Sequence, residues 1–442
     1  MFKRDLYLNE LIERKGNHLV KVITGIRRCG KSYLLNEIFH NFLLKEVTDD
    51  AHIISFAFDS EEDILKLEKF FPQEPTIIKD GGEEKINAKK FISYVQERVI
   101  DGQDYYLLLD EIQKLDRFVS VLNGFLRHSN YDVYVTGSNA RFLSKDVDTE
   151  FGGRASRIHL LPLSFNEYLS DVDKPKEKAL EDYLIYGGIP LVQKETSHQG
   201  KARVAESVLK ETYIRDILLR HENVNENKLT ETLRVISSMI STPINPTKIE
   251  KTFQGVYGIK MANDTIANYI GWFEDSYLLN RALRFDIKGR GYIGSPYKIY
   301  FEDIGVRNAI LNFRELDETD IIENIVYNEL RYRGYSVDVG VVYVNEPTDK
   351  LDKNGKSVYI QKTLEVDFVA NKGDKTLYIQ VALEIKNEEK KEQEYKSIRN
   401  IPDSFKKVII VKNDLLPRQI TKEGFLRLNL MEFLSKQDSL DD

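Results

Sequence analysis

A glycine-rich octapeptide, GIRRCGKS at residues 25–32, has the residue types and spacing that bind a phosphate chain. It fits the pattern G-x-x-x-x-G-K-[ST], in which backbone N–H groups surround the phosphates, the lysine reaches the β- and γ-phosphates and the hydroxyl binds Mg²⁺. An apolar run precedes it and a helical pattern, SYLLNEIF, follows, so a helix N-terminus would face the anion. The alternative is an ordinary glycine-rich turn. The predicted nucleotide-binding residues are Gly25, Ile26, Arg27, Arg28, Cys29, Gly30, Lys31, Ser32 and Tyr33.

Two later segments could complete this chemistry. The apolar run YYLLLDEIQ (105–113) brings Asp110 and Glu111 to the end of a strand. Asp110 could hold Mg²⁺ through water together with Ser32, and Glu111 could act as the general base that polarises the attacking water. A buried strand that ends in two solvated acids is the alternative. Asn139, at the end of VYVTGSNA (133–140), could contact the γ-phosphate or the attacking water, or it could only form a turn.

The chain also resembles a known group of proteins. The segments GIRRCGKSYLL, LLLDEIQ, VTGSNA, GGRASRIHLLPLSFNEYL and YLIYGGIP are similar to those of bacterial and archaeal AAA-type ATPases with a C-terminal domain of uncharacterised function. This resemblance runs from residue 4 to about 412 and implies ATP and Mg²⁺ as cofactors and ATP hydrolysis as the reaction. It also places Arg154 or Arg157 where an arginine finger could stand, in the same chain or in a neighbouring subunit of a homo-oligomer. A surface ion pair is the alternative.

The order of apolar runs predicts the fold of the first part. Strand-like runs alternate with helical patterns at 32–43, 89–100 and 117–128. Such alternation with nearly continuous apolar strands predicts an α/β domain with a parallel sheet covered by helices on both faces. The resemblance implies that this domain is of the AAA-type P-loop class. We expect four parts: this ATPase domain (1–170), a helical connector (171–235), a winged-helix-like domain (236–312) and a nuclease-like α/β domain (313–442). The expected strands are 18–25, 52–58, 105–111, 132–139 and 157–163.

In the third part, the order of helical and strand patterns is typical of a winged helix. Helical patterns up to about residue 278 precede RALRFDIKGRGYIGSPYKIYF, which reads as a two-stranded hairpin. Between residues 245 and 300, eight basic residues face five acidic ones, a balance of +3 in a chain of net charge −7. Because DNA binding needs several phosphate contacts made together, duplex DNA is a partner that this segment could bind, with a protein-docking or lid role as the alternative.

The last part resembles the core of PD-(D/E)xK nucleases. LEVDFVANKGDKTLYIQVAL (364–383) predicts a β-hairpin with a turn at Lys-Gly-Asp, and the preceding helix carries Glu323. Glu323 and Asp367 match the nuclease pattern, but Gln380 replaces the second acid and Ala382 the lysine. Losing a carboxylate weakens Mg²⁺ binding, and losing the lysine removes a cation that would stabilise the reacting phosphate. The resemblance therefore implies an inactive remnant.

Three other lysines could replace the missing one. Lys386 has the right alternation, but four residues along a strand cover about 13 Å. Lys362 and Lys375 could approach from the neighbouring strand or the turn. An active nuclease would require one of them to reach the acids.

The overall composition indicates the cellular environment of the protein. The single cysteine, Cys29, excludes an internal disulfide framework and favours a cytoplasmic location. No apolar run approaches the ~18–20 residues that span a bilayer, so we expect no membrane partner.

The expected function is Mg²⁺-dependent ATP hydrolysis that moves the later domains, in association with DNA. A nucleotide-state switch that recruits a protein and an ATP-gated DNA endonuclease are the alternatives.

Overall fold

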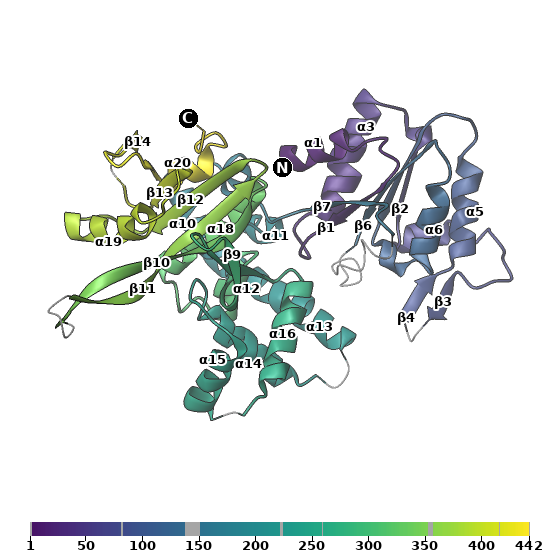
Figure 1. Cartoon of the computed structure of the whole chain (residues 1–442). Helices are drawn as coiled ribbons and strands as arrows, with labels where there is room; N and C mark the ends of the chain where they lie inside the picture. The colour runs from purple at the N-terminus through teal and green to yellow at the C-terminus, as the bar shows by residue number, and fades with distance from the viewer. Residues whose placement is uncertain are drawn as a thin grey trace. The chain divides into compact units, whose positions relative to one another are not determined.

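The computed structural model describes residues 2–80, 83–137, 151–221, 224–258, 260–351, 357–414 and 416–441 (Figure 1). The chain divides into two compact units. The first comprises Met1–Pro162 and Asp275–Tyr277, and the second comprises Leu163–Glu274 and Leu278–Asp442.

The first unit is built on a parallel sheet of five strands. Their order is β2-β5-β6-β1-β7, and every neighbouring pair is parallel. This confirms the predicted parallel sheet, and each strand lies within one or two residues of its expected start. The strands are β1 (Val20–Thr24), β2 (Ile53–Ala57), β5 (Tyr105–Asp110), β6 (Tyr131–Thr136) and β7 (Ala155–His159).

Helices cover both faces of this sheet, as the continuous apolar strands predict. On one face, α5 (Ala88–Arg98) and α6 (Phe118–Phe125) pack their apolar side chains against alternate residues of the strands. On the other face, the Phe39 ring meets the ring of Tyr134 at a centroid distance of 4.5 Å. Phe39 belongs to one helical segment that runs through α2 (Lys31–Tyr33), η1 (Leu34–Phe39) and α3 (His40–Glu46), and α1 (Asp5–Glu13) packs beside it.

The unit also contains short elements between the main strands. These are η2 (Asp50–His52), α4 (Glu61–Leu65), the antiparallel hairpin of β3 (Ile77–Asp80) and β4 (Glu83–Ile86), and η3 (Ile112–Lys114). The sequence patterns did not predict this hairpin.

A buried ion pair joins two central strands of the first unit. The Lys21 side chain on β1 is fully buried and its ammonium binds the Asp132 carboxylate on β6. The same carboxylate accepts hydrogen bonds from the Tyr134 hydroxyl at 2.8 Å and from the Gly16 N–H at 3.0 Å. Burial lowers the pKa of Lys21, and the charge of Asp132 opposes that shift. Each partner therefore keeps the other from being an uncompensated charge inside the sheet.

Replacing Asp132 with alanine should destabilise the chain strongly, because the Lys21 ammonium would be left buried without a partner. The expected loss is about 3–5 kcal/mol, measured by urea unfolding. Glu97→Ala is the matched control, since it also removes an acid from a lysine pair, but from the half-exposed pair with Lys69, and such pairs contribute at most about 1 kcal/mol. Equal effects of the two substitutions would contradict this account.

The second unit begins with helices. A capping box formed by Ser164 and Glu167 starts α9. The helices that follow are α9 (Phe165–Leu169), α10 (Lys176–Tyr186), α11 (Pro190–Gln193), α12 (His198–Ser207), η4 (Val208–Ile214), α13 (Arg215–Arg220), α14 (Glu226–Ser237), α15 (Pro246–Thr252), η5 (Phe253–Tyr257) and α16 (Asn263–Asp275).

An eight-stranded mixed sheet forms the rest of this unit. Its order is β14-β15-β13-β12-β11-β10-β8-β9. The predicted hairpin after α16 is confirmed as β8 (Leu279–Asp286) and β9 (Gly291–Phe301), and β8 pairs in parallel with β10. The sheet therefore runs across the boundary expected near residue 312. The remaining strands are β10 (Ser336–Leu351), β11 (Ser357–Lys372), β12 (Lys375–Ala382), β13 (Lys406–Val411), β14 (Gln419–Ile420) and β15 (Leu426–Asn429).

Further helices pack on this sheet. α18 (Glu318–Tyr332) contacts β9, β10, β11 and β12, and α19 (Glu388–Arg399) contacts β11 and β12. Tyr395 and Ile398 of α19 belong to the same core cluster as Val366 and Val369 of β11. α17 (Ile304–Ile310) and α20 (Leu430–Ser435) complete the unit.

A β-bulge interrupts β11. Gly340 of β10 pairs with Val366, whereas Asp338, two residues earlier, pairs with Val369, three residues later. Two residues of β11, Asp367 and Phe368, therefore stand opposite a single residue of β10. Bulges of this kind redirect side chains, and Phe368 contacts the Tyr327 ring of α18 at a centroid distance of 6.1 Å.

Candidate functional site

The glycine-rich loop lies between the end of β1 and the helical segment that begins at Lys31. Gly25 has φ +142°, and a Cβ there would lie 2.2 Å from the Leu160 carbonyl oxygen. Gly30 has φ +101°, a backbone conformation that residues other than glycine rarely adopt. Both glycines are therefore required by the backbone path of the loop. Within the loop, Ile26 and Cys29 are buried, whereas Arg27 and Arg28 are exposed.

Lys31 is held against the loop by its own ammonium group. Nζ donates to the carbonyl oxygens of Gly25 at 3.0 Å and Ile26 at 3.1 Å, and the residue is 6% exposed. The ammonium therefore lies at the loop itself, where a positive charge can compensate phosphate charge. The following N–H groups belong to the first turn of a helix, which has no internal partners for them.

Asp110, the last residue of β5, lies among hydroxyl groups at the same edge of the sheet. Its carboxylate accepts hydrogen bonds from the Thr136 and Ser32 hydroxyls and lies 3.4 Å from the Asn36 amide nitrogen. Burial raises the pKa of Asp110, while the bonds from Thr136 and Ser32 act in the opposite direction. The structure thus brings Ser32 and Asp110, the two predicted metal ligands, into contact.

Glu111 follows directly and turns away from the strand. Its φ of +52° is in the left-handed region, and its N–H donates to the Thr136 hydroxyl oxygen at 3.1 Å. Its carboxylate accepts a hydrogen bond from the Gln113 side-chain amide. A strained backbone of this kind persists where surrounding contacts hold it, and here Thr136 provides one of them.

These residues fit a magnesium–nucleotide complex. A hydroxyl and a carboxylate are hard oxygen donors of the type that Mg²⁺ binds alongside phosphate oxygens, and Ser32 and Asp110 already face each other. Lys31, the residue before Ser32, supplies a cation at the loop. The other predicted catalytic residue of this region, Asn139, lies outside the described residues.

Arg154 lies at the other end of the sheet. Its carbonyl oxygen accepts the Val20 N–H at 2.9 Å, which places it beside the first residue of β1. The loop follows the last residue of β1, Thr24, and four residues of strand cover about 13 Å. The exposed Arg154 instead lines a groove of about 870 Å³ with Arg117 and Arg127. Arg157 lies within β7.

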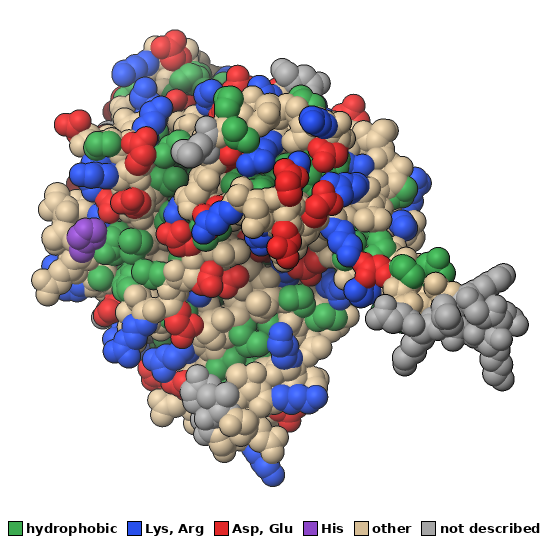
Figure 2. All heavy atoms as spheres, turned by 90° about the vertical axis from the view of Figure 1, so that its left-hand side faces the viewer, with side chains coloured by type: hydrophobic (Ala, Val, Ile, Leu, Met, Phe, Trp, Pro, Cys, Tyr) green, Lys and Arg blue, Asp and Glu red, His purple; other side chains and the backbone are tan. Residues whose placement is uncertain are grey.

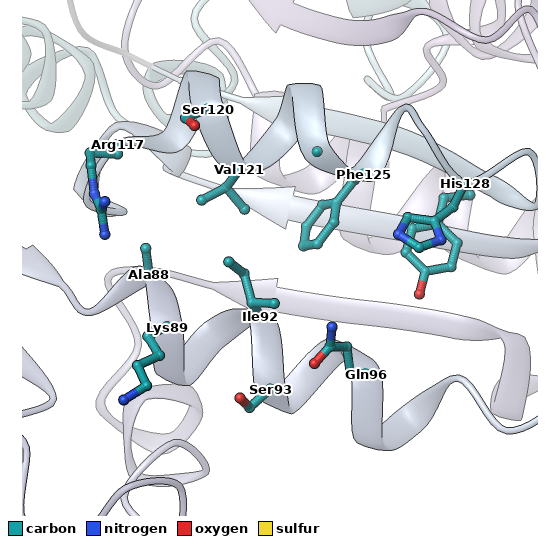
Figure 3. A pocket seen from close by; sticks show the side chains of 12 residues that line it. Ala88, Lys89, Ile92, Ser93, Gln96, Arg117, Ser120, Val121, Phe125 and His128 are labelled. Carbon is teal, nitrogen blue, oxygen red and sulfur yellow. The ribbon is translucent and has the colours of Figure 1, made fainter.

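A further hollow of the first unit lies between α5 and α6. It has a volume of about 480 Å³, and Ile92 of α5 faces Val121 and Phe125 of α6 across it (Figure 3). Its lining includes none of the predicted site residues. It is therefore a feature separate from the phosphate loop.

In the second unit, two of the predicted nuclease residues meet and the third does not join them. The predicted hairpin is confirmed, with Lys372 paired to Lys375 across the turn. Glu323 of α18 and Asp367 of β11 are both buried and interact electrostatically. Gln380, by contrast, accepts a hydrogen bond from Ser397 of α19 at 3.1 Å.

The three lysines considered as replacements are engaged elsewhere. Lys362 pairs with Glu346 at 2.5 Å, Lys386 pairs with Glu384 at 2.5 Å, and Lys375 lies 3.6 Å from an Asp441 oxygen. Each of these side chains is at least half exposed. The lysine that does meet the acids is Lys298 of β9, at 2.9 Å from Glu323, which sequence reasoning did not single out for this role. The sequence that begins at Lys298, KIYF, continues with apolar and aromatic residues. It indicates only that the strand is buried.

Comparison with known proteins identifies the family. Residues 17–169 match a family described as an AAA domain, and residues 177–317 match a domain of unknown function. An uncharacterized protein of Haemophilus influenzae is 30% identical over 416 residues, which cover 93% of both chains. This chain belongs to the same family as that protein. An uncharacterized protein of Methanocaldococcus jannaschii is 28% identical over 93% of this chain and 84% of its own length.

Solved structures resemble the chain more distantly. A Walker-type ATPase of Pyrococcus abyssi is 14% identical, with a TM-score of 0.45 over 70% of this chain and 96% of its own. The ORC2 protein of Aeropyrum pernix, in ADPNP–ADP complexes, is 14% identical with a TM-score of 0.36 over 74% of this chain and 92% of its own. Within the described residues of our chain, every helix is too short or too polar to cross a membrane.

Gly25→Ala should disable the phosphate loop of the AAA domain while the rest of the domain stays folded. The added Cβ would collide with the Leu160 carbonyl oxygen, which belongs to the backbone and cannot rotate away. ATP binding, measured by fluorescence anisotropy of a labelled nucleotide, should fall at least about tenfold, the equivalent of 1.4 kcal/mol.

Gly102→Ala is the matched control, because a Cβ at that position of the same domain meets no atom within 4 Å. Unchanged nucleotide affinity in Gly25→Ala would show that the loop does not bind phosphate in the conformation described.

Proposed function

We propose that this protein binds ATP together with Mg²⁺ in its AAA domain and hydrolyses it to ADP and phosphate. The observation that carries the proposal is the contact between Ser32, at the start of the helical segment, and Asp110, at the end of β5. Lys31, the residue before Ser32, places its ammonium on the carbonyl oxygens of the same loop. The match of residues 17–169 to the AAA domain supports the same conclusion.

Each residue has a distinct role in this proposal. Lys31 binds the β- and γ-phosphates, and Ser32 and Asp110 hold Mg²⁺, whose charge offsets that of the phosphates. Glu111 positions and polarises the attacking water as the general base. The buried carboxylate of Asp110 has a raised pKa in the absence of a cation, so a bound cation would favour its ionised form. Asn139 remains a candidate for contact with the γ-phosphate or water.

Arg154 can serve this chemistry only from a second copy of the chain. Because it lies beside the first residue of β1, it cannot reach the loop that follows the last residue of the same strand. In the proposed homo-oligomer, Arg154 of one subunit stabilises charge on the phosphates bound by its neighbour. The same groove is lined by Arg117 and Arg127 and also by Asp80 and Asp116, and Arg117 pairs with Asp116 at 3.0 Å.

We propose that the nucleotide state is transmitted to the second unit, and that duplex DNA is the partner of its helices and hairpin. The structure reduces the charge available for this contact. Of the eight basic residues between 245 and 300, Lys298 is buried and Arg281 pairs with Glu274 at 2.7 Å. Exposed cations remain on and near α15 and on the β8–β9 turn: Lys248, Lys251, Lys260, Lys288 and Arg290.

The surface in Figure 2 is consistent with a limited contact. Acidic and basic side chains alternate across that face, without a continuous basic area. DNA binding by several phosphate contacts would therefore concentrate on the few cations named above. DNA cleavage is not part of the proposal, because Gln380 is bonded to α19 and the three exposed lysines pair elsewhere.

Two substitutions test binding and hydrolysis separately. Lys31→Ala should abolish binding of Mg-ATP, because the cation beside the phosphates is lost. Glu111→Gln should keep near-normal binding but lower the rate of phosphate release by about 10²–10⁴-fold, the typical contribution of a general base. Lys31→Ala protein that still binds Mg-ATP with wild-type affinity would overturn the assignment of the site.

The same hydrolysis assay, with and without duplex DNA, tests the partner. Faster hydrolysis with DNA, lost in Lys248→Glu/Lys251→Glu, is the expected result. An unchanged rate together with no DNA binding would replace this part of the proposal with a switch that recruits a protein. Nicking of supercoiled plasmid, lost in Asp367→Ala, would show that the nuclease alternative is correct.

Arg154 is tested by mixing two inactive variants. Arg154→Ala subunits keep an intact phosphate loop but lack the arginine, and Lys31→Ala subunits supply the arginine but bind no nucleotide. Mixed oligomers should recover part of the hydrolysis rate, measured as phosphate release. Mixing Arg154→Ala with a Lys31→Ala/Arg154→Ala double variant is the control, and equal rates in both mixtures would contradict action between subunits.

A further inference from the structure

A short stretch of chain after β7 leads from the first unit into the second. The passage falls between Pro162 and Leu163. The stretch is LLPL (160–163), which has no regular secondary structure and which the nucleotide site described above does not use. We call residues 160–163 the connector.

At its first end the connector lies against the phosphate loop. The Leu160 N–H donates to the Thr24 carbonyl oxygen at 2.8 Å, and the Leu160 carbonyl oxygen is so close to Gly25 that a Cβ there would approach it to 2.2 Å. The Leu161 N–H donates to the Tyr7 hydroxyl oxygen of α1 at 3.1 Å. A movement of Gly25 therefore displaces the connector.

At its other end the connector is clamped within the second unit. The Leu163 N–H donates to the Gly188 carbonyl oxygen at 2.8 Å, and the Leu163 carbonyl oxygen accepts the Tyr183 hydroxyl at 2.7 Å. A Cβ at Gly188 would lie 2.2 Å from the Leu163 carbonyl oxygen, so the two backbones are in close contact. Tyr183 and Gly188 belong to the segment YLIYGGIP (183–190).

A buried carboxylate fixes this clamp. Asp303 is 4% exposed, and its two oxygens accept the Gly188 N–H at 2.7 Å and the Val306 N–H at 3.0 Å. Asp303 is thereby the N-cap of α17 and holds the glycine segment at the same time. Gly187, with φ +68°, has no room for a Cβ, which would lie 2.4 Å from an Asp303 oxygen. We call Leu163, Gly188 and Asp303 the joint.

The connector between these two ends has little freedom. Pro162 fixes its own φ near about −65° and restricts the residue before it, Leu161, to extended conformations. The three steps from Leu160 to Leu163 span at most about 11 Å. A displacement at one end is therefore passed to the other.

The phosphate loop has a reason to move when nucleotide binds. Lys31 Nζ donates to the carbonyl oxygens of Gly25 and Ile26, and phosphate oxygens compete for the same three N–H donors. Binding of ATP thus changes the hydrogen bonds of Gly25, the residue against which Leu160 packs.

A second passage of the chain reaches the same place. Residues Asp275–Tyr277 return to the first unit, where the Tyr277 ring meets the His159 ring at a centroid distance of 4.4 Å. His159, the last residue of β7, directly precedes Leu160, and its Nδ1 lies 3.3 Å from the Thr24 hydroxyl oxygen. Both passages therefore meet the first unit at the end of β7.

We propose that the connector is the route by which the nucleotide state reaches the second unit. ATP binding shifts Gly25 and with it Leu160, and Leu163 passes this shift to the joint. The inference rests on the proposed function, because Gly25 opens the proposed ATP site. Leu163 and Gly188 are positioning residues that act on the second unit.

The test measures the distance between the two units. Ile100→Cys and Ile420→Cys, at positions 78% and 65% exposed, carry nitroxide labels, and the native Cys29 is only 1% exposed. Double electron–electron resonance compares the protein without nucleotide and with Mg²⁺ and ADPNP. We expect ADPNP to shift the distance between the labels.

Gly188→Ala should lose most of this shift, because the added Cβ collides with the Leu163 backbone and opens the joint. Its affinity for ADPNP, measured by competition with a labelled nucleotide, should stay that of the wild type, since the phosphate loop belongs to the first unit. Gly294→Ala is the matched control in the second unit, because a Cβ there meets no atom within 4 Å. It should keep the full shift.

A second variant covers the case in which Gly188→Ala does not fold. Two glycines inserted between Pro162 and Leu163 lengthen the connector without changing any side chain, and the shift should again be lost. The same insertion after Gly102, an exposed glycine of the first unit, is its control and should leave the shift intact.

The outcomes separate this inference from the proposed function. A normal shift in folded Gly188→Ala, or in the connector insertion, overturns the inference and leaves Asp275–Tyr277 as the route. Labelled protein without these changes that binds ADPNP and shows no shift also overturns it, while ATP binding by the AAA domain stands. Wild-type protein that binds no ADPNP overturns the proposed function and this inference with it.

Discussion

The nucleotide site depends on one contact between strand ends. β1 and β5 are not neighbours, since β6 lies between them, yet parallel strands present all their carboxyl ends at one edge. Thr136, the last residue of β6, binds the Asp110 carboxylate and accepts the N–H of Glu111. Thr136 thereby helps to hold the Asp110 carboxylate at this edge, where it also bonds to Ser32 of the loop after β1.

The parallel arrangement of the strands also explains why Arg154 lies away from this site. Arg154 belongs to β7, which is parallel to β1 and pairs with it from Val20 to Thr24. A residue at the start of β7 must therefore lie at the amino edge, away from the phosphate loop. Because the strands are parallel, the loop and Asp110 lie at the carboxyl edge of the sheet and Arg154 lies at the amino edge. Any action of Arg154 on the phosphates therefore involves another copy of the chain.

Sequence patterns predicted most of the first unit, because its strands are apolar on both faces and its phosphate loop has a fixed spacing. They also predicted helices before the hairpin, and α16 lies there with Ile266, Tyr269, Ile270 and Phe273 buried. They did not predict the ion pairs that the buried Lys298 forms with Glu323 and Glu365. These residues come from a strand, a helix and a bulged strand that only the tertiary fold brings together, so no local pattern distinguishes Lys298 from a solvated lysine.

The bulge in β11 is the reason that alternation failed as a guide there. Strict alternation would place Asp367 and Gln380 opposite each other on one face, as a nuclease core requires. The extra residue of β11 in its pairing with β10 falls at this position. Asp367 interacts with the charges of Glu323 and Lys298, whereas Gln380 of β12 accepts a hydrogen bond from Ser397 of α19. Local irregularities of this kind leave no signature in a pattern of apolar and polar residues.

The most direct measurement of the central claim is the affinity for ATP with Mg²⁺ and with EDTA, in the wild type and in Asp110→Asn. The contact between Ser32 and Asp110 predicts that Mg²⁺ strengthens ATP binding by the wild type and that most of this gain disappears in the variant. ATP affinity that is the same with Mg²⁺ and with EDTA in the wild type would contradict the account.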